Sequence, residues 1–175
     1  MSILDELILV VEPPPAGVVP APDWAATEAR LGLTLPADYK LLVERYGPGA
    51  FDKFLHVLQP GCTSVYVQLE AQAERMEELF EAFQAGNEPL PYDAGRLLPV
   101  AVTDNGDTVY WIRDPEDRPD DWRIVANGAR NTKWPEFDGG IVDFLVAVLS
   151  RATYIEVFPR AFPRPDPVFA RYPAR

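Results

Sequence analysis

The sequence predicts an α+β fold, in which helices pack against a mostly antiparallel sheet of about four to six strands. Apolar residues recur at helical spacing in the first half of the chain, most clearly at Tyr39, Leu42, Val43 and Tyr46. Short β-prone runs follow, and Asn105-Gly106 separates two of them. Asn-Gly indicates a tight hairpin because both residues accept positive φ. A last helical pattern then closes the domain, as expected when strands and helices segregate along the chain.

The first predicted elements are a short helix and a linker. Residues 2–11 have the pattern of an amphipathic helix, and Ser2 and Asp5 have the spacing of a capping box. Three prolines at 13–15 end this helix, because proline lacks the amide hydrogen and clashes with the preceding turn. The chain up to Pro22 is therefore expected to be an extended linker.

Two further helices are predicted before residue 50. The first spans 24–31, with Asp23 as its N-cap and Gly32 as the left-handed residue at its end. The second opens at Pro36, which is tolerated in a first turn, and stops at residues 47–49, Gly-Pro-Gly.

The next elements are a strand at 54–58, a turn at 61–64 and a long helix to about residue 85. The buried stripe of that helix is formed by Leu69, Ala73, Met76, Phe80 and Phe83. Four glutamates run along an adjacent face, namely Glu70, Glu74, Glu77 and Glu81. Like charges at this spacing cost a few tenths of a kcal/mol per pair. The face is either a binding surface or simply a solvated one.

Strands are predicted at 96–103, 108–112, 122–127 and 134–137, with a turn at 128–133 between the last two. Asp138 is expected to cap the closing helix, whose inward residues are Ile141, Phe144, Leu145 and Val148. A strand-like run follows at 154–158. The remaining tail is rich in proline but also in aromatics, which disordered segments lack, so it should lie ordered against the body.

An ordered set of residues gives the chain a family resemblance. The pattern is E-x-x-LG-x-x-LP-x-DY, followed by a helix and Tyr-Gly. Its members here are Glu28, Leu31, Gly32, Leu35, Pro36, Asp38, Tyr39, Tyr46 and Gly47. Later matches are Leu98-Pro99, the stretch 104–111 and Phe144-Leu145.

This pattern resembles the SUKH superfamily, which joins a fungal cell-wall-assembly regulator to many bacterial immunity proteins. The resemblance covers roughly residues 20–150 and implies a curved, largely antiparallel sheet. It divides the chain into an N-terminal helix and linker at 1–22, a SUKH-like domain at 23–150 and an extension at 151–175 packed on that domain.

Composition excludes several classes of protein. The chain of 175 residues is 47% hydrophobic and 25% charged, which suits one soluble domain. No apolar run approaches the roughly 20 residues of a membrane span, and the start lacks the basic region of a signal peptide. The single Cys62 excludes an internal disulfide and fits a reducing compartment, so the sequence predicts a cytoplasmic protein.

The net charge of −11 disfavours binding to nucleic acid and to anionic membranes, and favours a basic protein partner. The charge is uneven. Residues 151–175 hold five Arg against two carboxylates, so the first 150 residues carry −14. Solubility alone is the alternative reason for an acidic composition.

No catalytic, metal or cofactor motif is found. His56 is the only histidine and lies in an apolar run, and no acid is predicted to orient it towards Cys62. A zinc site needs three or four His or Cys ligands, and the sequence contains only one residue of each type. Phosphate-binding glycine loops are absent. The protein is therefore predicted to be no enzyme and to hold no metal or cofactor.

The loop 114–121, DPEDRPDD, is the most acidic stretch, but it lacks the glycine and spacing of an EF-hand calcium loop. Aromatics rimmed by charge resemble interface hot spots, and Tyr110, Trp111, Trp122 and Trp134 lie close to the acidic loop in sequence. Any of these rings could equally be core. The candidate partner-binding residues are Asp104, Asp107, Asp114, Glu116, Asp117, Asp120, Asp121 and Trp122, together with Glu70, Glu74, Glu77 and Glu81.

The resemblance and the acidic body together favour a non-enzymatic immunity protein. It would bind a cognate, basic toxin, a nuclease being one candidate, and neutralise it by covering its cleft. The alternative is a regulatory scaffold that binds endogenous proteins through its Pro-rich ends. A third reading, an unrecognised hydrolase, would need a ligand or metal at the acidic loop.

Overall fold

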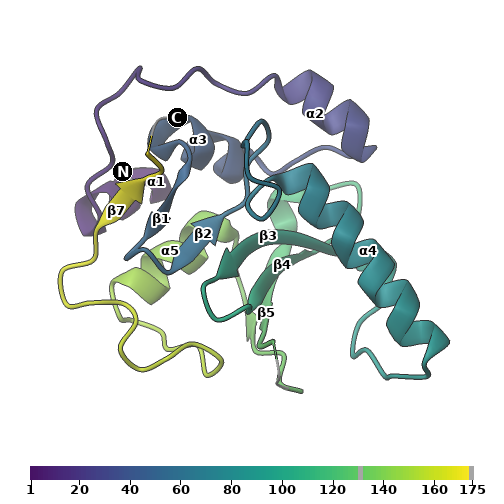
Figure 1. The fold of residues 1–175 in the computed structure, drawn as a ribbon. Coiled ribbons are helices and arrows are strands. Elements are labelled where there is room, and N and C mark those ends of the chain that lie inside the picture. The colour runs from purple at the N-terminus through teal and green to yellow at the C-terminus, as the bar shows by residue number, and fades with distance from the viewer. Residues whose placement is uncertain (130–131, 174–175) are drawn as a thin grey trace.

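The computed structural model describes residues 1–129 and 132–173, and it confirms the predicted α+β class (Figure 1). In these residues five α-helices pack on one antiparallel sheet that does not close. The sheet has seven strands, which exceeds the predicted four to six, in the order β6-β5-β4-β3-β2-β1-β7. Within the described ranges, no helix combines the length and the apolar character needed to cross a membrane.

The helices are α1 (Ile3–Val10), α2 (Trp24–Leu31), α3 (Ala37–Tyr46), α4 (Leu69–Ala85) and α5 (Ile141–Leu149). The strands are β1 (Gly49–Phe51), β2 (Leu55–Val57), β3 (Leu97–Thr103), β4 (Thr108–Ile112), β5 (Arg123–Asn127), β6 (Glu136–Phe137) and β7 (Phe169–Arg171). Two 3₁₀ turns, η1 (Ala94–Arg96) and η2 (Pro119–Asp121), precede β3 and β5. Part of the predicted turn at 128–133, residues 130 and 131, lies outside the described residues.

Strands β1 to β6 follow one another across the sheet, whereas β7 joins it from the far end of the chain. β7 pairs antiparallel with β1, with Gly49 opposite Arg171 (Figure 1). Neither β1 nor β7 was predicted. The predicted strand at 154–158 is wrong: the Phe158 amide donates to the Ile155 carbonyl and closes a turn. Ile155 and Phe158 are buried, so this turn still anchors the tail to the core, as expected.

The sheet separates two hydrophobic cores of unequal size. Alternate residues of β4 point to opposite faces, as the pleat requires. Val109 and Trp111 face the large core, shared with α1, α3 and α5. Tyr110 and Ile112 face the smaller core under α4. The burial of both faces explains why all five residues of β4 are buried.

Local signals define most helix ends. Ser2 and Asp5 form the predicted capping box of α1, and Asp23 caps α2. Gly32 ends α2 at φ 68°, a left-handed conformation that suits glycine. The predicted cap of α5 is wrong, because Asp143, and not Asp138, accepts a hydrogen bond from the Gly140 amide.

Asp38 joins the start of α3 to the start of α5. Its carboxylate accepts hydrogen bonds from the amides of Tyr39 and Val142, at 2.7 and 3.0 Å. Burial nevertheless raises the pKa of this carboxyl group, because desolvation outweighs those hydrogen bonds. A Cβ at residue 140 would lie 2.5 Å from Asp38 Oδ2, so the close approach requires Gly140.

The side chain of Tyr39 crosses the large core. Its hydroxyl donates to the Leu58 carbonyl at 2.6 Å, and its ring meets Trp24 and Trp111 edge-on. The residue is fully buried.

We predict that Tyr39→Phe lowers the free energy of unfolding by about 1–3 kcal/mol, because the ring stays while the Leu58 carbonyl loses its buried donor. Urea denaturation measures the difference. Tyr154→Phe is the matched control: its hydroxyl donates to the Phe158 carbonyl, but the residue is 55% exposed. The control should change stability by less than about 0.5 kcal/mol. Equal losses in the two variants would contradict the prediction.

The Glu28 carboxylate supports the turn between α2 and α3. Burial pushes its pKa up, but hydrogen bonds from Lys40 and from the Leu35 amide outweigh burial and hold the pKa below the ordinary 4.5. Because folding favours the ionised carboxylate, Glu28 stabilises the folded state fully above pH 4.5. This stabilisation is lost as the pH falls through the lowered pKa.

We predict that Glu28→Gln destabilises the protein by up to about 1 kcal/mol at pH 7. The difference from the unsubstituted chain should shrink towards zero as the solution is acidified below the lowered pKa. Denaturation at a series of pH values tests this, and a difference that grows on acidification would contradict it.

Candidate functional site: an acidic groove beside α4

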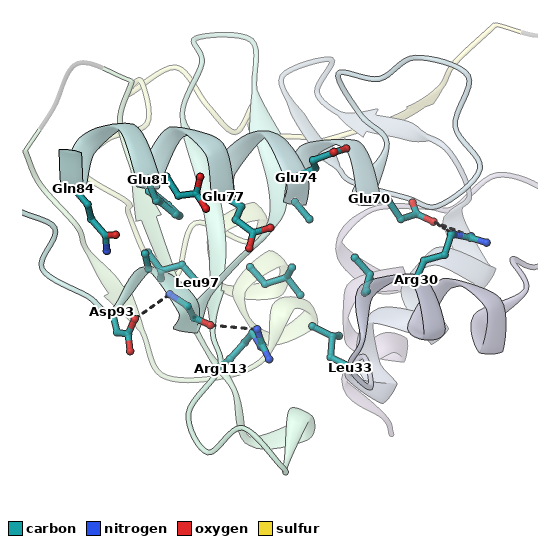
Figure 2. A pocket seen from close by; sticks show the side chains of 16 residues that line it. Arg30, Leu33, Glu70, Glu74, Glu77, Glu81, Gln84, Asp93, Leu97 and Arg113 are labelled. Carbon is teal, nitrogen blue, oxygen red and sulfur yellow. Dashed lines mark hydrogen bonds and ion pairs between the residues drawn. The ribbon is translucent and has the colours of Figure 1, made fainter. Parts of the chain in front are cut away.

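A groove of about 550 Å³ runs along α4 (Figure 2). One wall is the glutamate face of α4. A second wall is the end of α2 with the turn that follows it. The apolar part of the lining comes from Leu31, Leu33, Phe80, Leu97 and Leu98. Asp93 and Arg113 lie at the side of the groove opposite α4.

The four predicted glutamates of α4 all line this groove, as their helical spacing requires. Glu70 is paired: its Oε1 accepts from the Arg30 guanidinium at 2.9 Å. Glu74, Glu77 and Glu81 are exposed, and within the described residues no hydrogen bond or ion pair involves their carboxylates. Figure 2 shows Glu77 directed from α4 towards Arg113.

Two buried polar atoms at the groove lack a hydrogen-bond partner in the described part of the chain, namely Glu70 Oε2 and Arg113 Nε. The remaining Arg113 nitrogens donate to the Gly95 carbonyl and to Glu116 Oε1, at 3.2 and 3.1 Å. Glu116 thus neutralises Arg113 from outside the groove. A buried polar atom without a partner costs free energy, and a bound group can recover it.

The groove lining holds five carboxylates and two guanidinium groups. Glu116, which lies outside the lining, offsets the charge of Arg113 as well. A strongly negative cleft with apolar walls suits a basic side chain, because an aliphatic stem can lie on leucine while its cationic head meets the glutamates. Low-dielectric walls also focus the field of the cleft.

Three of the five carboxylates in the acidic loop 114–121 have partners among the described residues. Glu116 pairs with Arg113 and Arg96, and Asp121 pairs with Arg118. Asp120 accepts a hydrogen bond from the Ala37 amide at 2.7 Å and so stabilises the start of α3. Asp114 and Asp117 remain exposed, and in the described residues no partner of their carboxylates is recorded. The loop therefore offers less free charge than its sequence indicates.

Two of the predicted partner-binding residues are not at the surface. Trp122 is 2% exposed, and its Nε1 donates to the Pro115 carbonyl, so the ring holds the loop from beneath. Asp107 is 5% exposed and accepts from the Thr103 hydroxyl at 2.6 Å inside the β3–β4 turn. Both side chains are committed to the fold, which corrects the expectation that they present a binding surface. Tyr110 and Trp111 are also core residues.

Asp104 has a partner that the sequence did not reveal. Its Oδ1 lies 2.8 Å from His56 Nε2, and His56 Nδ1 lies 2.7 Å from the Tyr172 hydroxyl. Asp104 thus contacts His56 on the side away from Nδ1, whose partner is Tyr172, and among the described residues no hydrogen bond joins His56 to Cys62. The sheet pairing brings these residues together: β2 and β3 are neighbours, and β7 adds Tyr172 from the far end of the chain. No local pattern in the sequence could have found this contact.

Within residues 1–129 and 132–173, no group of three or more His, Cys, Asp or Glu side chains is arranged to hold a metal ion.

Comparisons with protein-family models, with curated proteins and with solved structures find no match to this chain.

We predict that Asp120→Ala lowers the free energy of unfolding by about 1 kcal/mol, since the start of α3 loses the acceptor of an amide. Asp117→Ala removes the same charge from the same loop and should change stability by less than about 0.5 kcal/mol. Thermal unfolding of both variants provides the measurement. If the two variants were equally stable, Asp120 would have no structural role and would return to the set of free surface charges.

Proposed function

We propose that this protein is a non-enzymatic, SUKH-like immunity protein that binds a basic toxin and neutralises it by occlusion. The observation that carries the proposal is the acidic groove, in which Glu74, Glu77 and Glu81 lie beside apolar walls and have no partner among residues 1–129 and 132–173. Of the two candidate surfaces, the groove retains more unpaired charge than the loop 114–121. We therefore place the principal contact there.

The mechanism is electrostatic attraction followed by desolvation. A chain with a net charge of −11 attracts a basic partner over distances comparable to the Debye length and raises the association rate. In the complex, an Arg or Lys of the toxin enters the groove and pairs with the glutamates of α4. The bound protein then covers the surface on which a nuclease would hold its nucleic acid.

The regulatory-scaffold alternative depends on free Pro-rich ends. The structure gives these ends contacts of their own: Arg45 donates to the Pro14 carbonyl, and Asp52 accepts from the amides of Arg164 and Val168. These contacts favour a compact binding protein over a scaffold with extended arms. The hydrolase alternative gains no support from Cys62, because burial raises the pKa of its thiol and keeps it protonated.

The experiment is co-expression with the product of the neighbouring gene, followed by titration of the two purified proteins in a calorimeter. Rescue of growth together with a saturable complex supports the proposal. A complex without rescue favours the scaffold, and the absence of both contradicts the immunity function.

We predict that Glu74→Gln, Glu77→Gln and Glu81→Gln together slow association with that partner by about tenfold or more and flatten its salt dependence. Stopped-flow mixing at several salt concentrations measures both effects.

A matched control removes three exposed carboxylates elsewhere, by Glu78→Gln, Asp114→Asn and Asp117→Asn. Because net charge changes equally, the control separates the groove from general electrostatics. It should slow association by less than about threefold. Equal effects of the two sets would show that charge acts without a defined docking site.

A further inference from the structure

A second, more open pocket lies on another part of the molecule. Its volume is about 930 Å³, and three segments far apart in sequence form most of it, together with Pro48 and His56. Val18 and Val19 come from the N-terminal linker, residues 61–67 come from the loop after β2, and residues 171–173 come from the tail. Pro48 and Val67 complete the apolar part of the lining. Pockets of this size with mainly aliphatic walls suit small organic molecules.

The hydrogen bonds of His56 fix one wall of this pocket. His56 Nε2 lies 2.8 Å from Asp104 Oδ1, and His56 Nδ1 lies 2.7 Å from the Tyr172 hydroxyl, so both ring nitrogens are engaged. The Tyr172 ring also stacks on the imidazole, with centroids 5.8 Å apart. The tail is therefore held in a defined position at the pocket, and the polar groups of this wall are already satisfied.

The pocket also contains unused hydrogen-bond donors and a positive charge. Arg171 lines it, and in the described part of the chain no hydrogen bond or ion pair involves its guanidinium. This is unexpected in a chain with 27 acidic and 16 basic residues, where a surface cation has many possible partners. The hydroxyls of Thr63 and Ser64 line the same pocket, and no hydrogen bond within the described residues uses them.

We propose that this pocket binds a small apolar molecule with one carboxylate, whose chain lies on the valines and whose head pairs with Arg171. The hydroxyls of Thr63 and Ser64 donate the remaining hydrogen bonds to the head. A charge-assisted contact between guanidinium and carboxylate provides selectivity over neutral or cationic analogues. The site is distinct from the acidic groove and does not depend on the function proposed for that groove.

Binding rather than catalysis is the role that the chemistry of the pocket supports. Cys62 is the only thiol, and burial raises its pKa, which keeps it protonated and weakly nucleophilic. Burial likewise raises the pKa of Tyr172 well above its ordinary value, so the phenol remains a neutral hydrogen-bonding group.

The test compares three probes of equal chain length on the full protein: octanoate, octan-1-ol and octylammonium. Chemical shifts of backbone amides are followed during titration. Octanoate should saturate one site, with the largest shifts at residues 61–67 and 171–173. The alcohol and the amine should bind about tenfold more weakly or worse, since one charge-assisted contact is worth roughly that factor. No saturable octanoate binding, or equal affinity for the three probes, would overturn the proposal.

Arg171→Gln should reduce octanoate affinity by about tenfold and leave octan-1-ol affinity unchanged. Val18→Trp fills the pocket from an exposed position and should weaken both probes. Arg160→Gln is the control, because it removes one exposed Arg that does not line the pocket, and it should change neither affinity. If Arg171→Gln leaves octanoate affinity intact, the assignment is wrong. The three-probe comparison on the unsubstituted chain decides the matter even if a variant fails to fold.

Discussion

The side chain of Tyr39 is the contact on which the arrangement of the first half of the chain depends. Its hydroxyl binds the carbonyl that follows β2, and its ring lies between Trp24 of α2 and Trp111 of β4. Burial raises its pKa well above the ordinary value, so it remains a neutral donor at any physiological pH. Because α3 is held there, the turn before it is held too, and that turn forms one wall of the acidic groove.

The motif that suggested the SUKH superfamily consists largely of residues with structural tasks. Glu28 and Gly32 shape the turn between α2 and α3, and Asp38 connects α3 to α5. Such residues specify how the chain is built, and a fold of this kind can serve several functions. The proposed activity therefore depends on charges elsewhere. Folding divides those charges into carboxylates that hold the structure, such as Asp120 and Asp107, and carboxylates that remain available, such as Glu77.

The helix ends and the hairpin could be predicted from the sequence because their signals are local. Caps at Ser2 and Asp23, the left-handed Gly32 and the hairpin around Asn105-Gly106 each depend on a few neighbouring residues. Sequence reasoning failed where the partner is distant. β1 is too short to recognise until β7 pairs with it, and the contact between His56 and Tyr172 joins positions 116 residues apart. Trp122 was misplaced for the same reason, because its burial depends on the loop folding over it.

The seventh strand has a consequence for how ligand binding and chain motion are related. Among the described strands β7 pairs with β1 alone. Asp52 anchors the segment before β7, and Tyr172 directly after it contacts His56 of β2. Arg171 and Tyr172 reach the apolar pocket only while this pairing is intact. Local unfolding of the tail and occupancy of the pocket therefore exclude each other. By linkage, any molecule held there slows hydrogen exchange and proteolysis at the C-terminal end, and the ease with which that end detaches limits how long the molecule stays.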